Sequence, residues 1–183
     1  RLGIDVWELI ELANHHPRVN ILQPGPGVGG HCIAVDPWFI VSSVPEEARI
    51  IKMARDVNDG KPEWVIKKVK EALDGKPAAV VAALGIAFKN DIDDLRESPS
   101  LNIVKQLGQE NPQLDIRVVE PNVNALPDSL AAIPNVSQQD LDTAIAEADL
   151  ILLLVNHKEF VALDTTKLQG KTVIDTKGIW RNL

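Results

Sequence analysis

The first 75 residues show the spacing of apolar side chains that is typical of amphipathic helices. Apolar residues recur every three or four positions over residues 4–16, 46–59 and 62–73, so each segment has one apolar face. Pro17 ends the first pattern, and Pro62 fits the first turn of the third. The stretch "PWFIVSSV" has no clear period, and the sequence leaves open whether it forms a helix or a strand. We predict a helical block up to about residue 75.

From residue 76 onward the pattern changes to short apolar runs separated by polar helical segments. Residues 78–88 form a continuous apolar run, as expected for a strand buried on both faces. Further strands are predicted within residues 114–121, 149–156 and 171–178. Helices are expected to begin at the N-cap Ser98, with Pro99 in the first turn, and over residues 137–148. This alternation predicts an α/β fold built from βαβ units around a parallel sheet.

Composition narrows the class of protein. The formal net charge of −7 gives no positive surface for nucleic acid or anionic lipid, and no apolar run approaches the roughly 20 residues that span a bilayer. The chain contains one cysteine, which excludes an internal disulfide framework and favours a cytoplasmic enzyme. Because the chain opens with Arg1 rather than Met, we expect it to be part of something longer.

The segment "NILQPGPGVGGHCIAVDPWFI" (20–40) holds that cysteine, Cys32, at the end of a loop rich in glycine and proline. A free cysteine is most often a buried structural residue. The loop supports a second interpretation, because glycines let backbone N–H groups approach a ligand and activate a thiol. Cys32 is then a nucleophile, and Asp36 either positions a water molecule or only caps a turn or helix. The glycines in question are Gly25, Gly27, Gly29 and Gly30.

A metal site is the third alternative for this region. His15, His16 and His31 are zinc-type ligands that lie near Cys32 and Asp36 in the sequence. Their spacing matches no zinc finger or metalloprotease pattern, and adjacent His31 and Cys32 would rarely both reach one metal ion. We therefore predict no metal site.

The stretch "AFKNDIDDLRESPS" (87–100) leaves the first predicted strand and enters a helix whose N-terminus can bind an anion. Lys89 and Arg96 are the cations within reach of phosphate oxygens. The alternative is a solvated loop in which neighbouring carboxylates pair with them. The single glycine of "ALGIAF" means that the dinucleotide fingerprint G-x-G-x-x-G is absent here.

The motifs "GVGGHCIAVDPW", "GIAFKNDIDDLRESPS" and "DTKGIW" together resemble the nucleotide-sugar 6-dehydrogenases of the UDP-glucose/GDP-mannose dehydrogenase family. The resemblance covers essentially the whole chain. It implies part of a central helical dimerisation domain over residues 1–75 and a Rossmann-like UDP-binding domain over residues 76–183. His31 before Cys32 favours the branch that acts on UDP-N-acetyl-D-mannosamine over the UDP-glucose branch, which carries Ser at that position.

The resemblance also implies an NAD-dependent, two-step oxidation of a sugar CH₂OH to a carboxylate. Cys32 matches the family's nucleophile, and Asp36 matches the aspartate that assists the water and thioester steps. Arg96 matches an arginine that contacts NAD. Substrate contacts are implied for His16, Arg18, Gly29, Phe88, Lys89 and Lys177.

The family's amino-terminal NAD-binding domain has no counterpart in this sequence. The chain alone is therefore expected not to oxidise a substrate. A non-catalytic nucleotide-sugar-binding or dimerisation module is the alternative, as is a dehydrogenase for another UDP-hexose such as UDP-glucose. In each case the resemblance implies a homodimer that forms through the helical segment.

Overall fold

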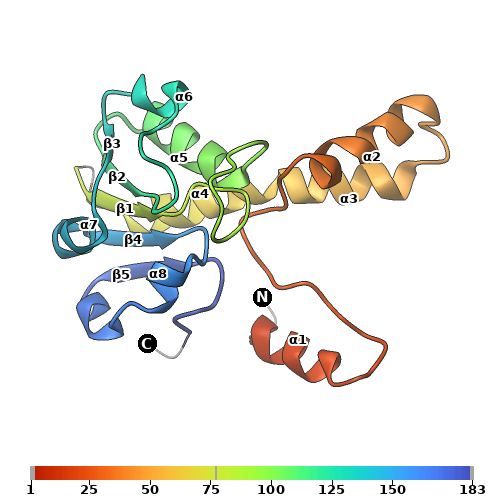
Figure 1. Ribbon diagram of the computed structural model, residues 1–183, viewed down its shortest axis with the longest axis horizontal. Coiled ribbons are helices and arrows are strands. Elements are labelled where there is room, and N and C mark those ends of the chain that lie inside the picture. Colours follow the sequence, from red (N-terminus) through yellow and green to blue (C-terminus); the bar gives the residue numbers. More distant parts are fainter. Residues whose placement is uncertain (1–2, 77, 182–183) are drawn as a thin grey trace.

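The computed structural model describes residues 3–76 and 78–181, and its centre is a five-stranded parallel sheet (Figure 1). The order of the strands across the sheet is β3-β2-β1-β4-β5. The strands are β1 (Val80–Leu84), β2 (Asp115–Val119), β3 (Val136–Gln138), β4 (Leu150–Leu153) and β5 (Thr172–Asp175). The chain winds outward from β1 to β3 and then returns to place β4 on the other side of β1. The predicted α/β fold with a parallel sheet is confirmed.

Helices cover both faces of this sheet, which explains why its central strands are apolar throughout. Alternate residues of β1 face opposite sides: Val81 packs into one hydrophobic cluster and Ala82 into another. The first cluster includes side chains of α4 (Lys61–Ala72) and α5 (Pro99–Glu110), and the second includes α7 (Leu141–Glu147). The short elements α6 (Asp128–Ala131), α8 (Lys158–Val161) and η1 (Thr165–Leu168) complete the domain.

Helix α5 begins as predicted. The hydroxyl oxygen of Ser98 accepts a hydrogen bond from Leu101 N–H at 3.2 Å, and Pro99 occupies the first turn. The same hydroxyl donates to the Ile86 carbonyl at 2.7 Å. Ser98 therefore caps the helix and also fixes it to the segment that leaves β1.

One predicted helix is partly wrong. Residues 137–148 were expected to be helical, yet Val136–Gln138 form strand β3, paired in parallel with β2, and α7 begins only after the N-cap Asp140. The pairing supplies hydrogen bonds to the edge of β2 that a longer α7 could not. The local pattern "VSQQD" contains no sign of this, because strand pairing depends on a neighbour distant in sequence.

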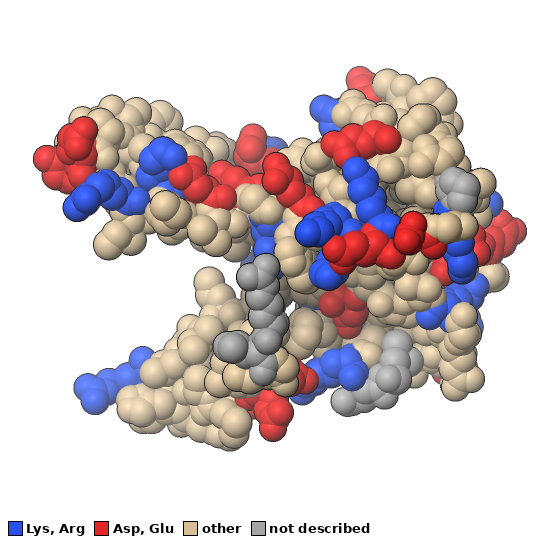
Figure 2. Space-filling model, turned by 180° about the vertical axis from the view of Figure 1, so that it is seen from behind, with Lys and Arg blue, Asp and Glu red and all other residues tan. Residues whose placement is uncertain are grey.

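The helical block consists of α1 (Val6–Asn14), α2 (Cys32–Ser43), α3 (Arg49–Asp59) and α4. The stretch "PWFIVSSV", for which the sequence left helix or strand open, is helical and belongs to α2, which contains Pro37 in its interior. Helices α2 and α3 pack as a hairpin that projects from the body of the molecule (Figure 1). In the space-filling view a hollow separates this hairpin from α1 (Figure 2).

Helix α4 connects the hairpin to the sheet. Its residues Val65, Ile66 and Val69 are buried in the first hydrophobic cluster, and the helix packs beside α5. The domain division near residue 75 stays a prediction. Among residues 3–76 and 78–181, no helix is both long and apolar enough to cross a membrane.

Candidate functional site: a basic cavity beside the cysteine loop

Four of the predicted substrate residues line one cavity of about 800 Å³. Phe88 and Lys89 stand just beyond the carboxyl end of β1, Lys177 follows β5, and Gly29 belongs to the cysteine loop (residues 20–31). Helix α3 closes another wall with Ala54, Val57 and Asn58. The cavity therefore lies between the carboxyl end of the sheet and the α2–α3 hairpin.

The position of Phe88 and Lys89 follows from the order of the strands. The chain reverses its winding between β1 and β4, and ligands of open α/β sheets bind outside the carboxyl ends of the strands at such a point. The segment that leaves β1 is therefore the expected place for ligand-binding residues. The backbone N–H of Phe88 donates to the Asp94 carbonyl at 3.1 Å, which folds the loop back on itself.

The charges on the cavity wall are all of one sign. Lys61, Lys89 and Lys177 line it, and the described lining residues include no aspartate or glutamate. This contrasts with the net charge of −7 on the whole chain. The Lys61 ammonium is held 4.3 Å from the centre of the Trp64 ring. A cavity of this kind attracts an anion such as a diphosphate.

Lys177 is placed by the residue that ends β5. The carboxylate of Asp175 accepts hydrogen bonds from the backbone N–H groups of Lys177, Gly178 and Trp180 at 2.7–2.8 Å. Burial lowers the pKa of Lys177 below its ordinary value, and Asp175 offsets part of this effect. An anion in the cavity would favour the charged ammonium over the neutral amine.

The cysteine loop is packed between α3 and the start of α5. A Cβ atom on Gly29 would lie 2.1 Å from the Glu97 carbonyl oxygen, and one on Gly30 would lie 2.9 Å from the Phe88 ring. Gly30 also has a φ of +92°. These two glycines are therefore required for the loop to pack against the protein itself, whatever contacts they make with a ligand.

Cys32 is exposed and is the first residue of helix α2. The interpretation as a buried structural cysteine is therefore wrong. Its Sγ lies 3.8 Å from His31 Nδ1, and the N-terminus of a helix favours a negative charge. Asp36 is also exposed. Because it lies four residues, about one helical turn, after Cys32, the two side chains share a face of α2. The neighbouring Ile33 lines the basic cavity.

His16 and Arg18 lie apart from this cavity. They follow α1 and are exposed, and His16 Nδ1 accepts a hydrogen bond from Arg18 N–H at 3.2 Å. Neither residue lines the basic cavity of the same chain. Their proposed contact with substrate stays a prediction.

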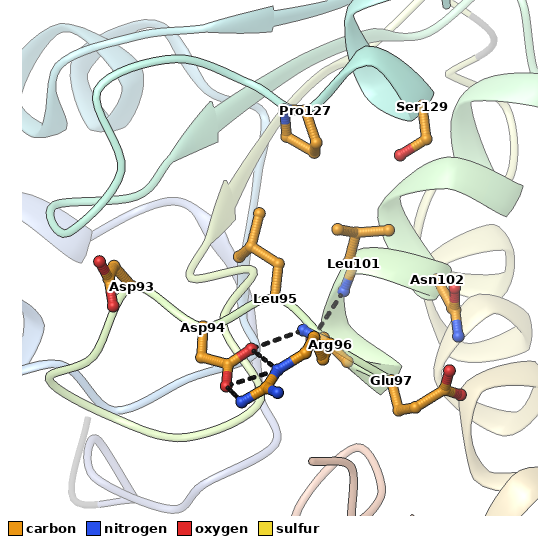
Figure 3. Close-up of a pocket in the computed structure, with 10 residues that line it drawn as sticks. Asp93, Asp94, Leu95, Arg96, Glu97, Leu101, Asn102, Pro127 and Ser129 are labelled. Atoms are coloured by element: carbon orange, nitrogen blue, oxygen red, sulfur yellow. Dashed lines mark hydrogen bonds and ion pairs between the residues drawn. The ribbon is translucent and has the colours of Figure 1, made fainter. Parts of the chain in front are cut away.

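Arg96 lines a second cavity, of about 660 Å³, between the loop after β1 and the start of α6 (Figure 3). Its guanidinium bonds both carboxylate oxygens of Asp94, with Nε 3.0 Å from each oxygen and Nη2 2.5 Å from Oδ2. Hydrogen bonds from the Arg96 side chain and backbone lower the pKa of Asp94 to about 2. Arg96 is exposed, so its outer face is free to meet a phosphate.

The described residues do not form an NAD site of their own. In dinucleotide-binding sheets an acidic residue near the end of β2 binds the ribose hydroxyls. Here the acid after β2 is Glu120, which is buried and accepts hydrogen bonds from Ile86 N–H at 2.8 Å and Ala87 N–H at 3.1 Å. Its carboxylate is turned inward and is already bonded, and the glycine fingerprint is missing. The contact between Arg96 and NAD that the family resemblance implies stays a prediction.

Three further groups were missed by sequence reasoning. Asn58 holds the cysteine loop through Val28, Lys61 adds a charge to the cavity wall, and Glu120 forms a buried pair with His157. Glu120 and His157 follow the strands that were predicted within residues 114–121 and 149–156, but the inward orientation of their side chains had no signal in the sequence. Over residues 3–76 and 78–181, no three histidine, cysteine or acidic side chains come together as metal ligands.

Family models cover both parts of the chain. Residues 1–60 match the central domain of the UDP-glucose/GDP-mannose dehydrogenase family, and residues 82–182 match the UDP binding domain of that family. The chain belongs to the UDP-glucose/GDP-mannose dehydrogenase family.

Curated relatives agree with this assignment. The chain is 53% identical over 180 residues to the NDP-N-acetyl-D-galactosaminuronic acid dehydrogenase of Ralstonia nicotianae. It is 51% identical over 187 residues to the UDP-N-acetyl-D-mannosamine dehydrogenase of Escherichia coli K12. Each match covers 98% of this chain but only 41% and 44% of the relative, so the chain spans about two fifths of the length of these proteins.

Solved structures show the same arrangement. The UDP-N-acetyl-mannosamine dehydrogenase of Staphylococcus aureus matches with a TM-score of 0.76 at 37% identity, covering 97% of this chain and 41% of that one. The UDP-D-ManNAc dehydrogenase of Pyrococcus horikoshii matches with a TM-score of 0.79 at 33% identity, over the same shares of the two chains. Both proteins are dehydrogenases by name.

Proposed function

We propose that this chain is the carboxyl-terminal part of an NAD-dependent UDP-sugar 6-dehydrogenase that oxidises UDP-N-acetyl-D-mannosamine to the uronate. The observation that carries the proposal is the cavity lined by Lys61, Lys89 and Lys177 beside the loop that ends in Cys32. It combines a place for a diphosphate with a nearby thiol. The UDP-binding domain of the family supports a UDP-sugar as the ligand.

The UDP part of the substrate occupies the basic cavity. Lys89, which follows β1, and Lys177, which follows β5, both contact the diphosphate, since both line the cavity at the carboxyl edge of the parallel sheet. The Phe88 ring supplies an apolar wall and Gly29 a loop contact. We expect the sugar to extend toward the start of α2, where Cys32 lies next to the cavity residue Ile33.

Cys32 provides the covalent step of the reaction. The alcohol first loses a hydride and a proton to become an aldehyde. The Cys32 thiolate adds to the aldehyde carbon, the resulting thiohemiacetal loses a second hydride to give a thioester, and water hydrolyses the thioester to the carboxylate and free thiol. A thiol is required because the aldehyde needs a covalent partner before the second oxidation.

The neighbours of Cys32 suit these steps. Cys32 is the first residue of α2, and its Sγ lies 3.8 Å from His31 Nδ1, close enough to exchange a proton with the ring. Asp36, on the same helix face, orients the water that attacks the thioester. Two NAD⁺ molecules, bound one after the other, would each accept one hydride. This chain would contribute Arg96 toward the cofactor, and we expect the rest of the NAD site to lie in the part of the longer protein that this chain does not cover.

We also propose a homodimer that forms through the α2–α3 hairpin. Ile50 and Met53 of α3 and Phe39 of α2 are between 61% and 85% exposed in the single chain. Apolar side chains at this density on one projecting hairpin are typical of a surface that is covered in the assembled protein. The second copy would also be the one that receives Arg18 and His16.

The sugar is the least determined part of the proposal, because relatives with two different substrate names are about equally similar. Mass spectrometry of products from the longer protein that includes this chain tests it. UDP-N-acetyl-D-mannosamine, UDP-N-acetyl-D-galactosamine and UDP-glucose are offered separately, and we expect the corresponding uronate from the first. Oxidation of UDP-glucose alone would contradict the assignment.

The alternative function is a non-catalytic UDP-sugar-binding module. It is favoured by one observation, that the described residues form a basic cavity but no NAD site. A longer protein that binds UDP-sugars yet forms no NADH with any of the three would support this alternative.

A further inference from the structure

A buried glutamate–histidine pair lies beneath the arch, residues 86–91, that presents Phe88 and Lys89. The Glu120 and His157 side chains are each 0% exposed, and Glu120 Oε2 lies 3.2 Å from His157 Nε2. Glu120 follows β2 and His157 follows β4, so the pair joins the two strands that flank β1. Keeping such a pair in the interior is costly, and neither residue takes part in the chemistry proposed above.

Glu120 holds the first end of the arch, Ile86 and Ala87, which we call its first foot. Its Oε2 accepts hydrogen bonds from the Ile86 and Ala87 N–H groups, at 2.8 and 3.1 Å. Its Oε1 accepts from Asn122 N–H at 3.1 Å. Burial raises the pKa of Glu120, but the hydrogen bonds from His157 and Ile86 outweigh it and hold the pKa below its ordinary value. The carboxylate is therefore charged at neutral pH.

His157 holds the second foot of the arch, which is Asp91. Its Nδ1 accepts a hydrogen bond from Asp91 N–H at 2.9 Å. A ring nitrogen that accepts carries no proton, so the neutral ring bears its proton on Nε2 and donates it to Glu120. Asp91 has a φ of +60°, and its carboxylate accepts from Lys158 N–H at 2.9 Å.

Only Phe88, Lys89 and Asn90 lie between these two feet. We propose that Glu120 and His157 are positioning residues: they hold both feet of the arch and so determine where Phe88 and Lys89 meet the UDP part of the substrate. This inference rests on the proposed binding of UDP in the basic cavity. It makes the buried pair a determinant of affinity rather than of stability alone.

Variants of Glu120 and His157 separate a role in UDP affinity from a role in stability alone. His157→Phe keeps the ring but removes the acceptor for Asp91 N–H, whereas His157→Asn offers an amide oxygen in the position of Nδ1. Glu120→Gln removes the charge that holds the first foot. Leu168→Ala is the matched control, because Leu168 is 2% exposed and packs in the second hydrophobic cluster, among no residues of the arch.

Each variant of this chain is titrated with UDP by calorimetry, well below its unfolding temperature. We expect His157→Phe and Glu120→Gln to bind about tenfold more weakly, as for the loss of a buried hydrogen bond to the arch. His157→Asn should recover part of the affinity. Leu168→Ala should unfold at a lower temperature and bind UDP as the parent does. Equal affinities for the parent, His157→Phe and Glu120→Gln would overturn the inference.

Amide hydrogen exchange on the same samples tests directly whether Glu120 and His157 hold the arch. The Asp91 and Ala87 amides should be protected in the parent, and His157→Phe should speed exchange at Asp91 while Leu168→Ala leaves it unchanged. If the parent itself does not bind UDP, the proposed function is contradicted for this chain. The exchange result then still decides whether the pair holds the arch: unchanged protection in both His157→Phe and Glu120→Gln would contradict it.

Discussion

The side-chain amide of Asn58 bonds both backbone groups of Val28. It accepts a hydrogen bond from Val28 N–H at 2.8 Å and donates one to the Val28 carbonyl at 3.2 Å. Asn58 lies at the end of α3, and Val28 lies four residues before Cys32. The position of the cysteine loop is thus fixed by the same helix whose outer surface we propose for the dimer.

Asn58→Ala should loosen the cysteine loop. The loss of both hydrogen bonds is expected to cost about 1–3 kcal/mol of stability and to weaken UDP binding, because Asn58 and Val28 both line the cavity. Thermal unfolding and calorimetry measure the two effects. Asn135→Ala is the control, since Asn135 donates to the Asn111 and Leu114 carbonyls, outside the cavity. A drop in UDP affinity as large for Asn135→Ala as for Asn58→Ala would contradict the role of the loop.

Lys89→Ala is expected to weaken UDP binding by about tenfold, as for a lost charge-assisted hydrogen bond. Lys158→Ala is the matched control: its ammonium is exposed on α8, and it is not among the residues that line the cavity. Raising the salt concentration should weaken binding by the parent more than by Lys89→Ala. If both lysine variants bind UDP as the parent does, Lys89 does not contact the nucleotide.

Binding of UDP should take up a proton at alkaline pH through Lys177. Burial lowers the pKa of this lysine in the free protein, and a bound diphosphate would raise it again. Between these two values the free amine is neutral and the bound amine is charged. Calorimetry at a series of alkaline pH values below the ordinary pKa of lysine, in buffers of different ionisation enthalpy, measures the uptake. Proton release, or an uptake that persists in Lys177→Met, would exclude this assignment.

The same shift predicts how stability varies with pH. Because the folded pKa of Lys177 lies below the unfolded value, the unfolded chain binds more protons between the two values. Stability attributable to Lys177 therefore rises as the pH increases through that window. Lys177→Met should flatten this part of the profile in chemical unfolding curves.

Cys32→Ala in the longer protein should abolish the second oxidation and leave aldehyde formation possible, since the thiol takes part only after the first hydride is lost. The ratio of NADH formed to sugar consumed measures this. The unfolding temperature should change little, because Cys32 is exposed. Two NADH per sugar from Cys32→Ala at the parent rate would show that Cys32 is not the nucleophile.

Ile50→Lys on α3 should shift the protein from dimer to monomer, because Ile50 is 85% exposed in the single chain and a buried, unpaired lysine at an interface is costly. Sedimentation velocity of this chain and the variant measures the change. Lys52→Glu is the control on the same helix, as Lys52 forms an exposed ion pair with Asp56. A parent that is monomeric at every concentration examined would contradict dimerisation through the hairpin of this chain.

Several features of this protein were determined locally and could be predicted from the sequence. The apolar run at β1 predicted a buried strand because burial on both faces requires it. Ser98 and Pro99 predicted the start of α5, since an N-cap and a first-turn proline act within a few residues. The exposed thiol of Cys32 and the cations Lys89 and Lys177 were identified as candidates from motifs alone.

Only the tertiary structure determined how distant residues come together. Strand β3 exists because β2 offers an edge to pair with, and Lys61 joins Lys89 and Lys177 because α4 begins beside the cavity. Glu120 and His157 meet because parallel strands bring their carboxyl ends to one edge of the sheet. Side-chain pattern reports which face of an element is buried, but the partner on the other side is set by packing between segments far apart in the chain.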